Sequence, residues 1–338
     1  MDSPSLETLT HEQWTVLKEI NLFTRNELKF ESPELCYYFL LRFCVARNFN
    51  VPEIKIMLTE YTNFYQSIVD KKLSQQNQST PSFSEIRSLL CMGFSYCDKL
   101  GRPILIYRLG QCKFKELFKK YSVDQVIDFH VQLAQRFLNI MLPVASRSQE
   151  KRVTKVLAII DCKDADILSF LSGKNSEFVK RLMHMGQFYY PSILGKQYII
   201  NAPALFSIFW TFAKHFLHPA TQERIEISHG LNQKKLIQEI GVDNLPKEYG
   251  GQVETDVRTN PGPWDAELEW SYKTGSFYLK QESIFQDYFW TKSERKCLDK
   301  TMIAPKNCIS LNELREINTE LVIREVKNTK MVVSMNAF

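Results

Sequence analysis

Residues 201–219 of this 338-residue chain read NAPALFSIFWTFAKHFLHP, and this stretch decides the fold that we expect. Pro203 favours the start of a helix and Pro219 its end, because proline is tolerated in the first turn but breaks a helix interior. Apolar side chains cover most of the circumference over 204–217, and the polar stripe is narrow, formed by Ser207, Thr211 and Lys214. An ordinary surface helix shows the opposite balance. The segment is therefore either a buried core helix or a helix whose apolar face contacts something other than protein.

Short apolar runs alternate with long helical patterns around this segment. Four runs have the length and composition of buried strands: 104–107, 156–160, 198–200 and 225–227. Helical patterns separate or follow them at about 123–142, 166–188, 204–217 and 231–240. Strands that alternate with helices indicate an α/β fold with a mostly parallel sheet.

The first 73 residues contain helical patterns alone and predict a bundle of three short helices. Thr10 and Gln13 have the spacing of a capping box, Ser32 precedes a second helix, and Asn50 precedes a third as its cap. A polar linker follows at 74–84. We expect three parts, listed here with their bounds: a helical unit at 1–73, an α/β domain at 85–253, and a C-terminal extension at 254–338, where 321–326 and 331–333 have the pattern of a hairpin.

Composition narrows the class of protein. The net charge of +5 suits weak attraction to an anionic membrane surface, but the clustered Lys and Arg of a nucleic-acid-binding protein are missing. No run approaches 18 apolar residues, so we predict no membrane span. The eight cysteines form no C-x-x-C pair and the N-terminus lacks the features of a secretory leader, so free thiols in the cytoplasm are expected.

Signatures of catalysis are weak. The sequence has no P-loop, no G-x-S-x-G and no H-E-x-x-H. Asp161 stands at a strand end, where we expect it to cap a helix, and Cys162 reads as a small buried side chain. His215 and His218 lack the further ligands that a metal site needs. We therefore expect no enzyme, no metal and no cofactor.

Four segments, in order along 30–252, resemble the CRAL-TRIO family. They read LLRFCVARNF at 40–49, DKLGRP at 98–103, GKQYIINAP at 195–203 after Tyr189-Tyr190-Pro191, and NLPKEYGG at 244–251. The second is similar to the turn before the first core strand of that family. The segments are most similar to those of the phosphatidylinositol transfer proteins of the secretory (Sec-fourteen) type.

This resemblance implies an N-terminal helical bundle and then a CRAL-TRIO domain, in which a five-stranded sheet floors a lipid pocket gated by the helix at 204–217. The side chains it implies for gate and pocket are Leu205, Phe206, Ile208, Phe209, Phe212 and Phe216. It further implies a carrier that binds one phosphatidylinositol and exchanges it between membranes. The ligand would be shielded from water while the gate is closed.

The resemblance also implies headgroup contacts at Arg47, Thr221 and Arg224, where the family has Arg, Thr and Lys. Arg suits a phosphate because its guanidinium binds it in a bidentate way. Ser192 stands where the family commonly has Glu, so the inositol-ring contact there is lost or replaced. Two other readings stay open: Arg47 contacts a helix C-terminus, and Arg224 is a surface charge.

Other departures from the family pattern concern phosphatidylcholine, the second phospholipid that the family often binds. The hydroxyl pair that the family uses for phosphatidylcholine falls at Val156 and Ala158, and Asp164 stands near a family glycine. Phosphatidylcholine binding is therefore in doubt, and a sterol is an alternative.

We expect a monomeric, cytoplasmic carrier that contacts the anionic surface of organelle membranes transiently and binds no nucleic acid. Two alternatives stay open. One is a CRAL-TRIO carrier or sensor of another hydrophobic ligand, phosphatidylcholine or sterol. The other is a lipid-regulated interaction module that binds a partner through 254–338.

Overall fold

The computed structural model describes residues 6–24, 33–74, 83–142, 145–146, 149 and 152–254. These residues fall into two compact units, whose boundary lies between Thr62 and Asn63. The hairpin predicted at 321–326 and 331–333 lies outside the described residues, as does Ser32.

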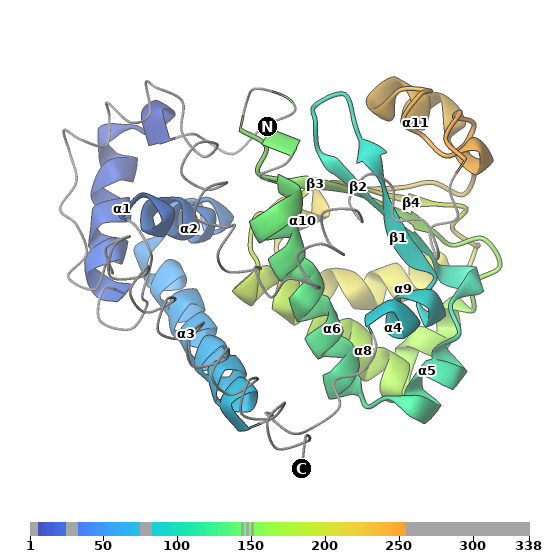
Figure 1. Cartoon of the computed structure of the whole chain (residues 1–338), viewed down its shortest axis with the longest axis horizontal. Coiled ribbons are helices and arrows are strands. Elements are labelled where there is room, and N and C mark those ends of the chain that lie inside the picture. Colours follow the sequence, from blue (N-terminus) through green and yellow to red (C-terminus); the bar gives the residue numbers. More distant parts are fainter. Residues whose placement is uncertain are drawn as a thin grey trace, which may run out of the picture. The chain divides into compact units, whose positions relative to one another are not determined.

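The first unit contains η1 (Leu6–Thr8), α1 (His11–Thr24), α2 (Pro33–Ala46) and the start of α3 (Val51–Ser74), as Figure 1 shows. The capping box is confirmed: the Thr10 hydroxyl accepts from Gln13 N at 3.2 Å, and the Gln13 side chain accepts from Thr10 N at 3.0 Å. The Asn50 side chain caps α3 by accepting from Glu53 N at 3.3 Å. With 24 residues, α3 is longer than the short helix predicted there.

The second unit contains a five-stranded sheet in the order β1-β2-β3-β4-β5. The strands are β1 (Met92–Cys97), β2 (Pro103–Arg108), β3 (Val156–Asp161), β4 (Leu194–Ile200) and β5 (Ile225–Ile227). β1 pairs with β2 in antiparallel fashion and the other neighbours are parallel, which confirms the predicted α/β fold.

The turn at 98–103 joins β1 to β2, so it precedes the second strand and not the first. Asp98 holds it by accepting from Leu100 N at 3.0 Å and Arg102 N at 2.7 Å. Gly101 has φ of +83°, a conformation that favours glycine. The sequence pattern did not predict β1.

Helices and short helical turns connect the strands. They are α4 (Phe83–Leu89), η2 (Leu109–Gln111), α5 (Phe114–Lys120), α6 (Val123–Arg136), η3 (Phe137–Met141), η4 (Ile167–Leu171), α8 (Gly173–His184), η5 (Met185–Tyr189), α9 (Phe206–Ala213), η6 (Lys214–Phe216), α10 (Pro219–Gln222), α11 (Gln233–Ile240) and η7 (Lys247–Tyr249). The long helices predicted at 123–142 and 166–188 are interrupted, since α6 and α8 each end in a π-helical turn, η3 and η5. Among the described residues, none of the helices combines the length and apolar composition that crossing a bilayer needs.

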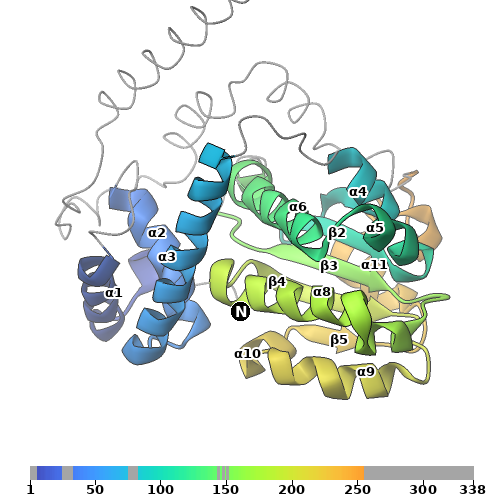
Figure 2. The same cartoon turned by 90° about the horizontal axis from the view of Figure 1, so that it is seen from below.

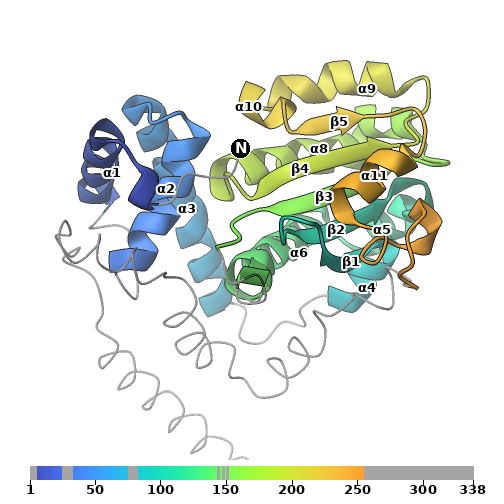
Figure 3. The same ribbon diagram turned by 90° about the horizontal axis from the view of Figure 1, so that it is seen from above.

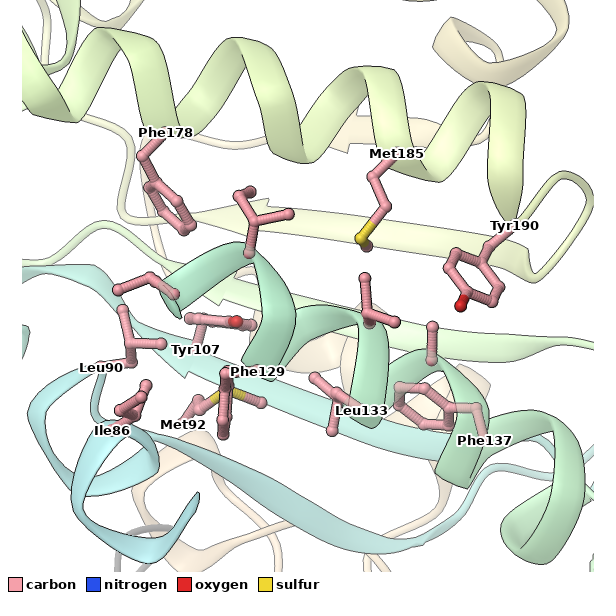
Figure 4. Packing of buried hydrophobic residues seen from close by; sticks show 14 of the residues in the cluster. Ile86, Leu90, Met92, Tyr107, Phe129, Leu133, Phe137, Phe178, Met185 and Tyr190 are labelled. Carbon is pink, nitrogen blue, oxygen red and sulfur yellow. The ribbon is translucent and has the colours of Figure 1, made fainter. Parts of the chain in front are cut away.

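The sheet has a different cover on each face. On one face Tyr198 and Ile200 pack with Leu236 and Ile240 of α11, and Figure 3 shows α11 in front of the sheet. On the other face the strands pack against α4, α5, α6 and α8. Figure 2 shows α6 and α8 in front of the sheet. Figure 4 shows this second core, with Phe129 and Leu133 of α6 and Phe137 of η3 beside Met92 and Tyr107 of the sheet. Both faces of the sheet are therefore covered by helices, as a parallel sheet requires.

Asp161 does not cap a helix, so that expectation is wrong. Its carboxylate accepts from Lys163 N at 3.0 Å, from the Asn201 side chain at 2.9 Å and from the Tyr249 hydroxyl at 3.3 Å. The cap of η4 is Asp166, whose side chain accepts from Ser169 N. Asp161 thus joins the ends of β3 and β4 to η7, which lies in the closing segment at 244–251. Cys162 next to it is buried, as predicted, and burial raises the pKa of its thiol to about 12.

A polar pair lies inside the core between the sheet and α6. The Tyr107 hydroxyl donates to His130 Nε2 at 2.5 Å, and His130 Nδ1 donates to the Val126 carbonyl at 2.7 Å. Both ring nitrogens are therefore satisfied in the neutral imidazole. The Phe178 ring lies 5.3 Å from the imidazole and keeps water away from it.

This buried histidine gives the fold a pH dependence. Burial lowers the pKa of His130 to about 4 from its ordinary 6.5, so between these values the unfolded chain binds a proton that the folded chain does not. We expect the free energy of unfolding to decrease as pH falls from about 6.5 toward about 4, by up to about 3 kcal/mol. Urea unfolding followed by circular dichroism at a series of pH values measures the change.

The double variant Tyr107→Phe/His130→Leu is the control, because it removes both hydrogen-bonding partners and the titrating group together. The pH dependence that comes from carboxylates remains in both proteins. An identical slope of unfolding free energy between about pH 6.5 and 5 in the two proteins would rule out His130 as the source.

Candidate functional site

The segment at 204–217 is helical but shorter and more varied than predicted. α9 starts at Phe206, η6 follows it, and Pro219 stands at the start of α10 with His218 as its cap. Residues 204–217 are called the gate segment below. Pro219 follows the end of this segment and also starts a new helical turn.

The side chains of α9 and its flanks differ in exposure. Phe206 is buried, and Phe209 and Phe212 are half-buried. Leu205 and Ile208 are each 50% exposed and Phe216 is 36% exposed. Six residues were predicted together for gate and pocket, and the structure separates them into an inner and an outer set.

The inner set packs against the edge of the sheet. Phe206 lies in a buried cluster with Ile199 of β4 and Ile167 of η4, and Phe209 packs against this cluster. The Phe209 ring is 5.5 Å from that of Phe206 and 6.0 Å from that of Phe170. The inner face of α9 is therefore a layer of aromatic rings over β4, β5 and η4.

A cation contacts the C-terminal end of the segment. The rings of Phe212 and Phe216 are 5.1 Å apart. The Lys180 ammonium of α8 lies 5.4 Å from the first and 5.9 Å from the second, within the range of a cation–π contact.

The two histidines nearby have ordinary structural roles. His215 Nδ1 donates to the Thr211 carbonyl at 2.6 Å, and His218 Nδ1 accepts from Ala220 N at 3.3 Å. In the part of the chain that the structure describes, no group of three or more His, Cys, Asp or Glu side chains has the arrangement of a metal site.

Two side-chain amides hold the ends of the gate segment. At the N-terminal end Asn201 has φ of +52° and donates to Asp161, while Ala202 N donates to the Ser228 carbonyl at 2.9 Å. At the C-terminal end Gln187 of η5 donates to the Phe216 carbonyl and accepts from His218 N. Sequence reasoning did not single out Gln187, because its partners lie 29 and 31 residues further along the chain.

Three of the four headgroup candidates lie in the second unit, around the start of β4. Arg224 donates to the Leu194 carbonyl at 2.9 Å, and burial lowers its pKa below the ordinary value. Thr221 is half-buried, and its carbonyl accepts from Arg224 N at 3.1 Å. Ser192 has φ of +59° in the turn before β4. The backbone thus brings Thr221 and Arg224 to the turn that contains Ser192.

Arg47 belongs to the first unit, just after α2. Its guanidinium donates to the Ala46 carbonyl at 3.1 Å and lies 3.8 Å from the Glu53 carboxylate. Burial lowers its pKa. The contact with the last carbonyl of α2 agrees with the helix C-terminal reading that the sequence left open.

The sheet face toward α6, α8 and α9 carries two separate apolar clusters. One lies under α6 and α8 and the other under α9, and Ile160 and Phe209 pack against both. Leu105, Ile160 and Gln197 face this side and are half-buried, although they belong to inner strands. These three side chains therefore keep accessible surface on this face.

The positions that depart from the family pattern can also be located. Val156 and Ala158 are buried on the same face of β3. Asp164 has φ of +60°, the left-handed conformation in which a glycine would be unstrained. The neighbouring loop packs closely, since a Cβ on Gly110 would lie 1.9 Å from the Lys163 carbonyl oxygen.

Comparison with known proteins agrees with this geometry. Residues 87–251 match the sequence profile of the CRAL/TRIO domain. The SEC14 cytosolic factor of Kluyveromyces lactis is 30% identical over 235 residues, which cover 68% of this chain and 77% of that protein. The chain belongs to the CRAL/TRIO family. Phosphatidylinositol/phosphatidylcholine transfer protein SFH12 of Arabidopsis thaliana is 28% identical over 236 residues, 68% of this chain and 42% of that protein.

The fold of this CRAL/TRIO chain is similar to a solved structure as well. The crystal structure of Sfh5 superimposes with a TM-score of 0.55 at 17% identity and covers 79% of this chain and 98% of that one. The chain spans less than half the length of SFH12 and of SFH4 of Arabidopsis thaliana, since the matched regions are each 42% of the relative.

Gln187→Ala tests the C-terminal attachment of the gate segment. The change removes both hydrogen bonds, so we expect the amides of 218–222 to exchange with deuterium roughly five- to tenfold faster. Hydrogen–deuterium exchange read by mass spectrometry measures this. Gln132→Ala, at an exposed glutamine of α6, is the matched control and should leave these amides unchanged. Equal protection in the two variants would mean that Gln187 does not hold the segment.

Proposed function

We propose that this chain is a lipid-transfer protein that binds one phosphatidylinositol in an apolar pocket and exchanges it between membranes. The observation that carries the proposal is α9, a short helix with aromatic rings on the sheet side and exposed apolar side chains outside. The names of the relatives support it, because SFH12 is a phosphatidylinositol/phosphatidylcholine transfer protein.

The energetics of the ligand require such a cover. Two acyl chains have on the order of 30 methylenes, and exposing each to water costs about 0.8 kcal/mol, so a carrier shields roughly 25 kcal/mol of apolar surface. We propose that the pocket lies on the sheet face toward α6, α8 and α9. The half-buried Leu105, Ile160 and Phe209 support this position, because side chains that line a hollow keep accessible surface.

The gate in this proposal is the segment from Leu205 to Phe216. Phe206, Phe209 and Phe212 face the ligand, while Leu205, Ile208 and Phe216 contact the membrane during exchange. Lys180 beside Phe216 adds attraction to anionic lipid. We infer a cytoplasmic monomer that associates peripherally with organelle membranes and catalyses no covalent reaction.

For the headgroup we propose contacts from Arg47, Thr221, Arg224 and Ser192. The half-buried guanidinium of Arg224 supports its role, because it makes one hydrogen bond to a carbonyl and no ion pair with the described carboxylates. A bidentate phosphate would add a directly bonded partner of opposite charge.

We also propose that the chain is divided into a helical unit at 1–73, a lipid-binding domain at 85–253 and an extension at 254–338. The family match at 87–251 supports the middle bounds.

The gate is tested with Phe209→Asp. A carboxylate at this position would stand among the rings of Phe170, Phe206 and Phe212, so lipid loading should fall at least roughly tenfold. Phe209 is a sharper choice than Phe212, because the ammonium of Lys180 would pair with a carboxylate placed at Phe212. Loading is measured by extracting lipid from the purified protein.

Thr211→Asp is the matched control for this variant. Thr211 is exposed on the same helix, so the same carboxylate there meets water and should leave loading unchanged. Circular dichroism checks that both variants fold. Full lipid loading in folded Phe209→Asp protein would overturn the gate assignment.

The headgroup is tested by native mass spectrometry of the purified protein and of Arg47→Ala/Arg224→Ala. Bound phosphatidylinositol should decrease roughly tenfold or more, because a hydrogen bond to a charged group contributes about 1.5–3 kcal/mol. Arg181→Ala is the control, since that arginine pairs with Asp124 and Glu177 on the surface.

The outcomes separate the claims. Phosphatidylinositol bound to wild type and retained by the double variant rejects the headgroup residues and keeps the carrier. Wild-type protein that takes no lipid from membranes rejects the proposed function.

A further inference from the structure

The two ends of the gate segment are held in different ways. At the N-terminal end the backbone continues the pairing of β4 with β5. Asn201 N donates to the Gly230 carbonyl at 3.1 Å, and the next residue, Ala202, donates to the Ser228 carbonyl. Phe206 follows and is buried in the cluster under α9. This end of the segment is therefore part of the core.

The C-terminal end is held mainly by polar side chains. Gln187 makes two of its hydrogen bonds, as described above. The Gln222 amide donates to the Lys214 carbonyl at 3.0 Å and to the Leu217 carbonyl at 2.9 Å. The ring at this end, Phe216, is partly exposed to water. Because few apolar contacts are buried here, we expect this end to open at a lower free energy than the other.

Lys180 is the charged side chain that connects this end to α8. Its ammonium lies within 6 Å of the rings of both Phe212 and Phe216, at 5.4 and 5.9 Å. The neighbouring Glu177 pairs with Arg181, and Lys180 forms no ion pair with the carboxylates that the structure describes. The two rings are therefore the contacts of this ammonium within the described part of the chain.

Contact with a membrane changes what is favourable for this ammonium. Phe216 enters the apolar layer in the proposed exchange, but a charge beside it cannot follow without a large cost of desolvation. A lysine at this depth extends toward the phosphate and carboxylate groups of the membrane surface. A charge-assisted hydrogen bond to these groups is stronger than a cation–π contact that is exposed to water. Insertion of the rings would therefore separate them from the ammonium.

We infer that Lys180 is a membrane-sensing latch, which holds the C-terminal end of the gate segment closed in solution and releases it when an anionic phospholipid of the bilayer binds the ammonium. The inference rests on the proposed function, because it assumes that the gate segment opens for lipid exchange. The partner is a lipid of the membrane surface and not the lipid bound in the pocket. Such a partner favours the open state because it binds the ammonium better there than in the closed state.

Lys180→Met tests the latch in solution. Methionine keeps an unbranched apolar side chain beside the rings and removes the charge. We expect the amides of 214–218 to exchange with deuterium roughly two- to fivefold faster than in wild type, which is the effect of losing a cation–π contact at an exposed site. Lys180→Arg keeps a cation and should restore wild-type exchange. Lys115→Met, at an exposed lysine of α5, is the matched control and should leave this exchange unchanged.

Anionic vesicles test the release. Wild type and both methionine variants are added to vesicles of phosphatidylcholine alone, or of phosphatidylcholine and phosphatidylserine in equal amounts. Vesicles are added until binding, followed by sedimentation, no longer increases, so that weaker docking does not enter the comparison. We expect the anionic vesicles to accelerate exchange at 214–218 roughly two- to fivefold in wild type and in Lys115→Met, with no further effect in Lys180→Met. The amides of 201–202 at the other end are the internal reference and should not change.

Each outcome decides one claim. Wild-type exchange in Lys180→Met without vesicles overturns the latch, and so does faster exchange at both ends, which would mean a general loss of stability. An equal response of Lys180→Met and wild type to phosphatidylserine overturns the membrane trigger. An equal response of wild type to the two kinds of vesicle overturns the need for an anionic lipid.

Transfer of phosphatidylinositol between vesicles, measured with the same proteins, separates this inference from the proposed function. Wild type that responds to phosphatidylserine at 214–218 but transfers no lipid keeps the latch and rejects the proposed function. Wild type that transfers phosphatidylinositol without this response keeps the proposed function and rejects the latch.

Discussion

The carboxylate of Asp161 is the interaction on which the second unit depends. It stands at the end of the central strand β3 and accepts hydrogen bonds from three segments: the following turn, Asn201 after β4, and Tyr249 of η7. A carboxylate that is surrounded by donors is held in one orientation, because each charge-assisted bond restricts it further. Asn201 in turn precedes α9, so the position of this helix relative to the sheet follows from the geometry at Asp161. The closing segment is tied to the same point, and a Cβ on Gly251 would lie 1.8 Å from the Leu245 carbonyl oxygen, which allows no larger residue there.

The sequence predicted the features that depend on residues near one another in the chain. The apolar runs of β2 and β3, the caps Thr10 and Asn50, and the apolar circumference of α9 are patterns of this kind. β1 was not predicted, because its sequence MGFSYC is short and mixes Gly and Ser with apolar residues. The role predicted for Asp161 was wrong, because its hydrogen-bond partner Tyr249 lies 88 residues further along the chain. Gln197 belongs to the family-like segment at 195–203, but the pairing of β4 with β3 and β5 was needed to tell which face of the sheet it occupies. Of the candidate site, the sequence and its family resemblance gave the residues, while the division of α9 into an inner and an outer face required the structure.

The attachment of α9 differs in kind from the packing of the core. The strands are held by ladders of backbone hydrogen bonds and are covered by helices on both faces. Each end of the gate segment is held by a few polar contacts, from Asn201 at one end and Gln187 at the other. Segments with few buried contacts open locally at a lower free energy than the whole fold. The π-helical turn η5, which presents Gln187, is an irregularity of the type that recurs at functional sites. In the proposed exchange of lipid, α9 would thus move on a sheet that is held more firmly.

β5 is three residues long and is the edge strand of the sheet on the side of α9. A long edge would present a row of unpaired N–H and carbonyl groups to any passing strand, and edge-to-edge pairing of this kind leads to aggregation. The short β5 offers too few of these groups to template another chain. If α9 moves away from the sheet as proposed, it therefore uncovers no long edge for pairing. The shortness of β5 would then protect the protein against self-association while the gate is open.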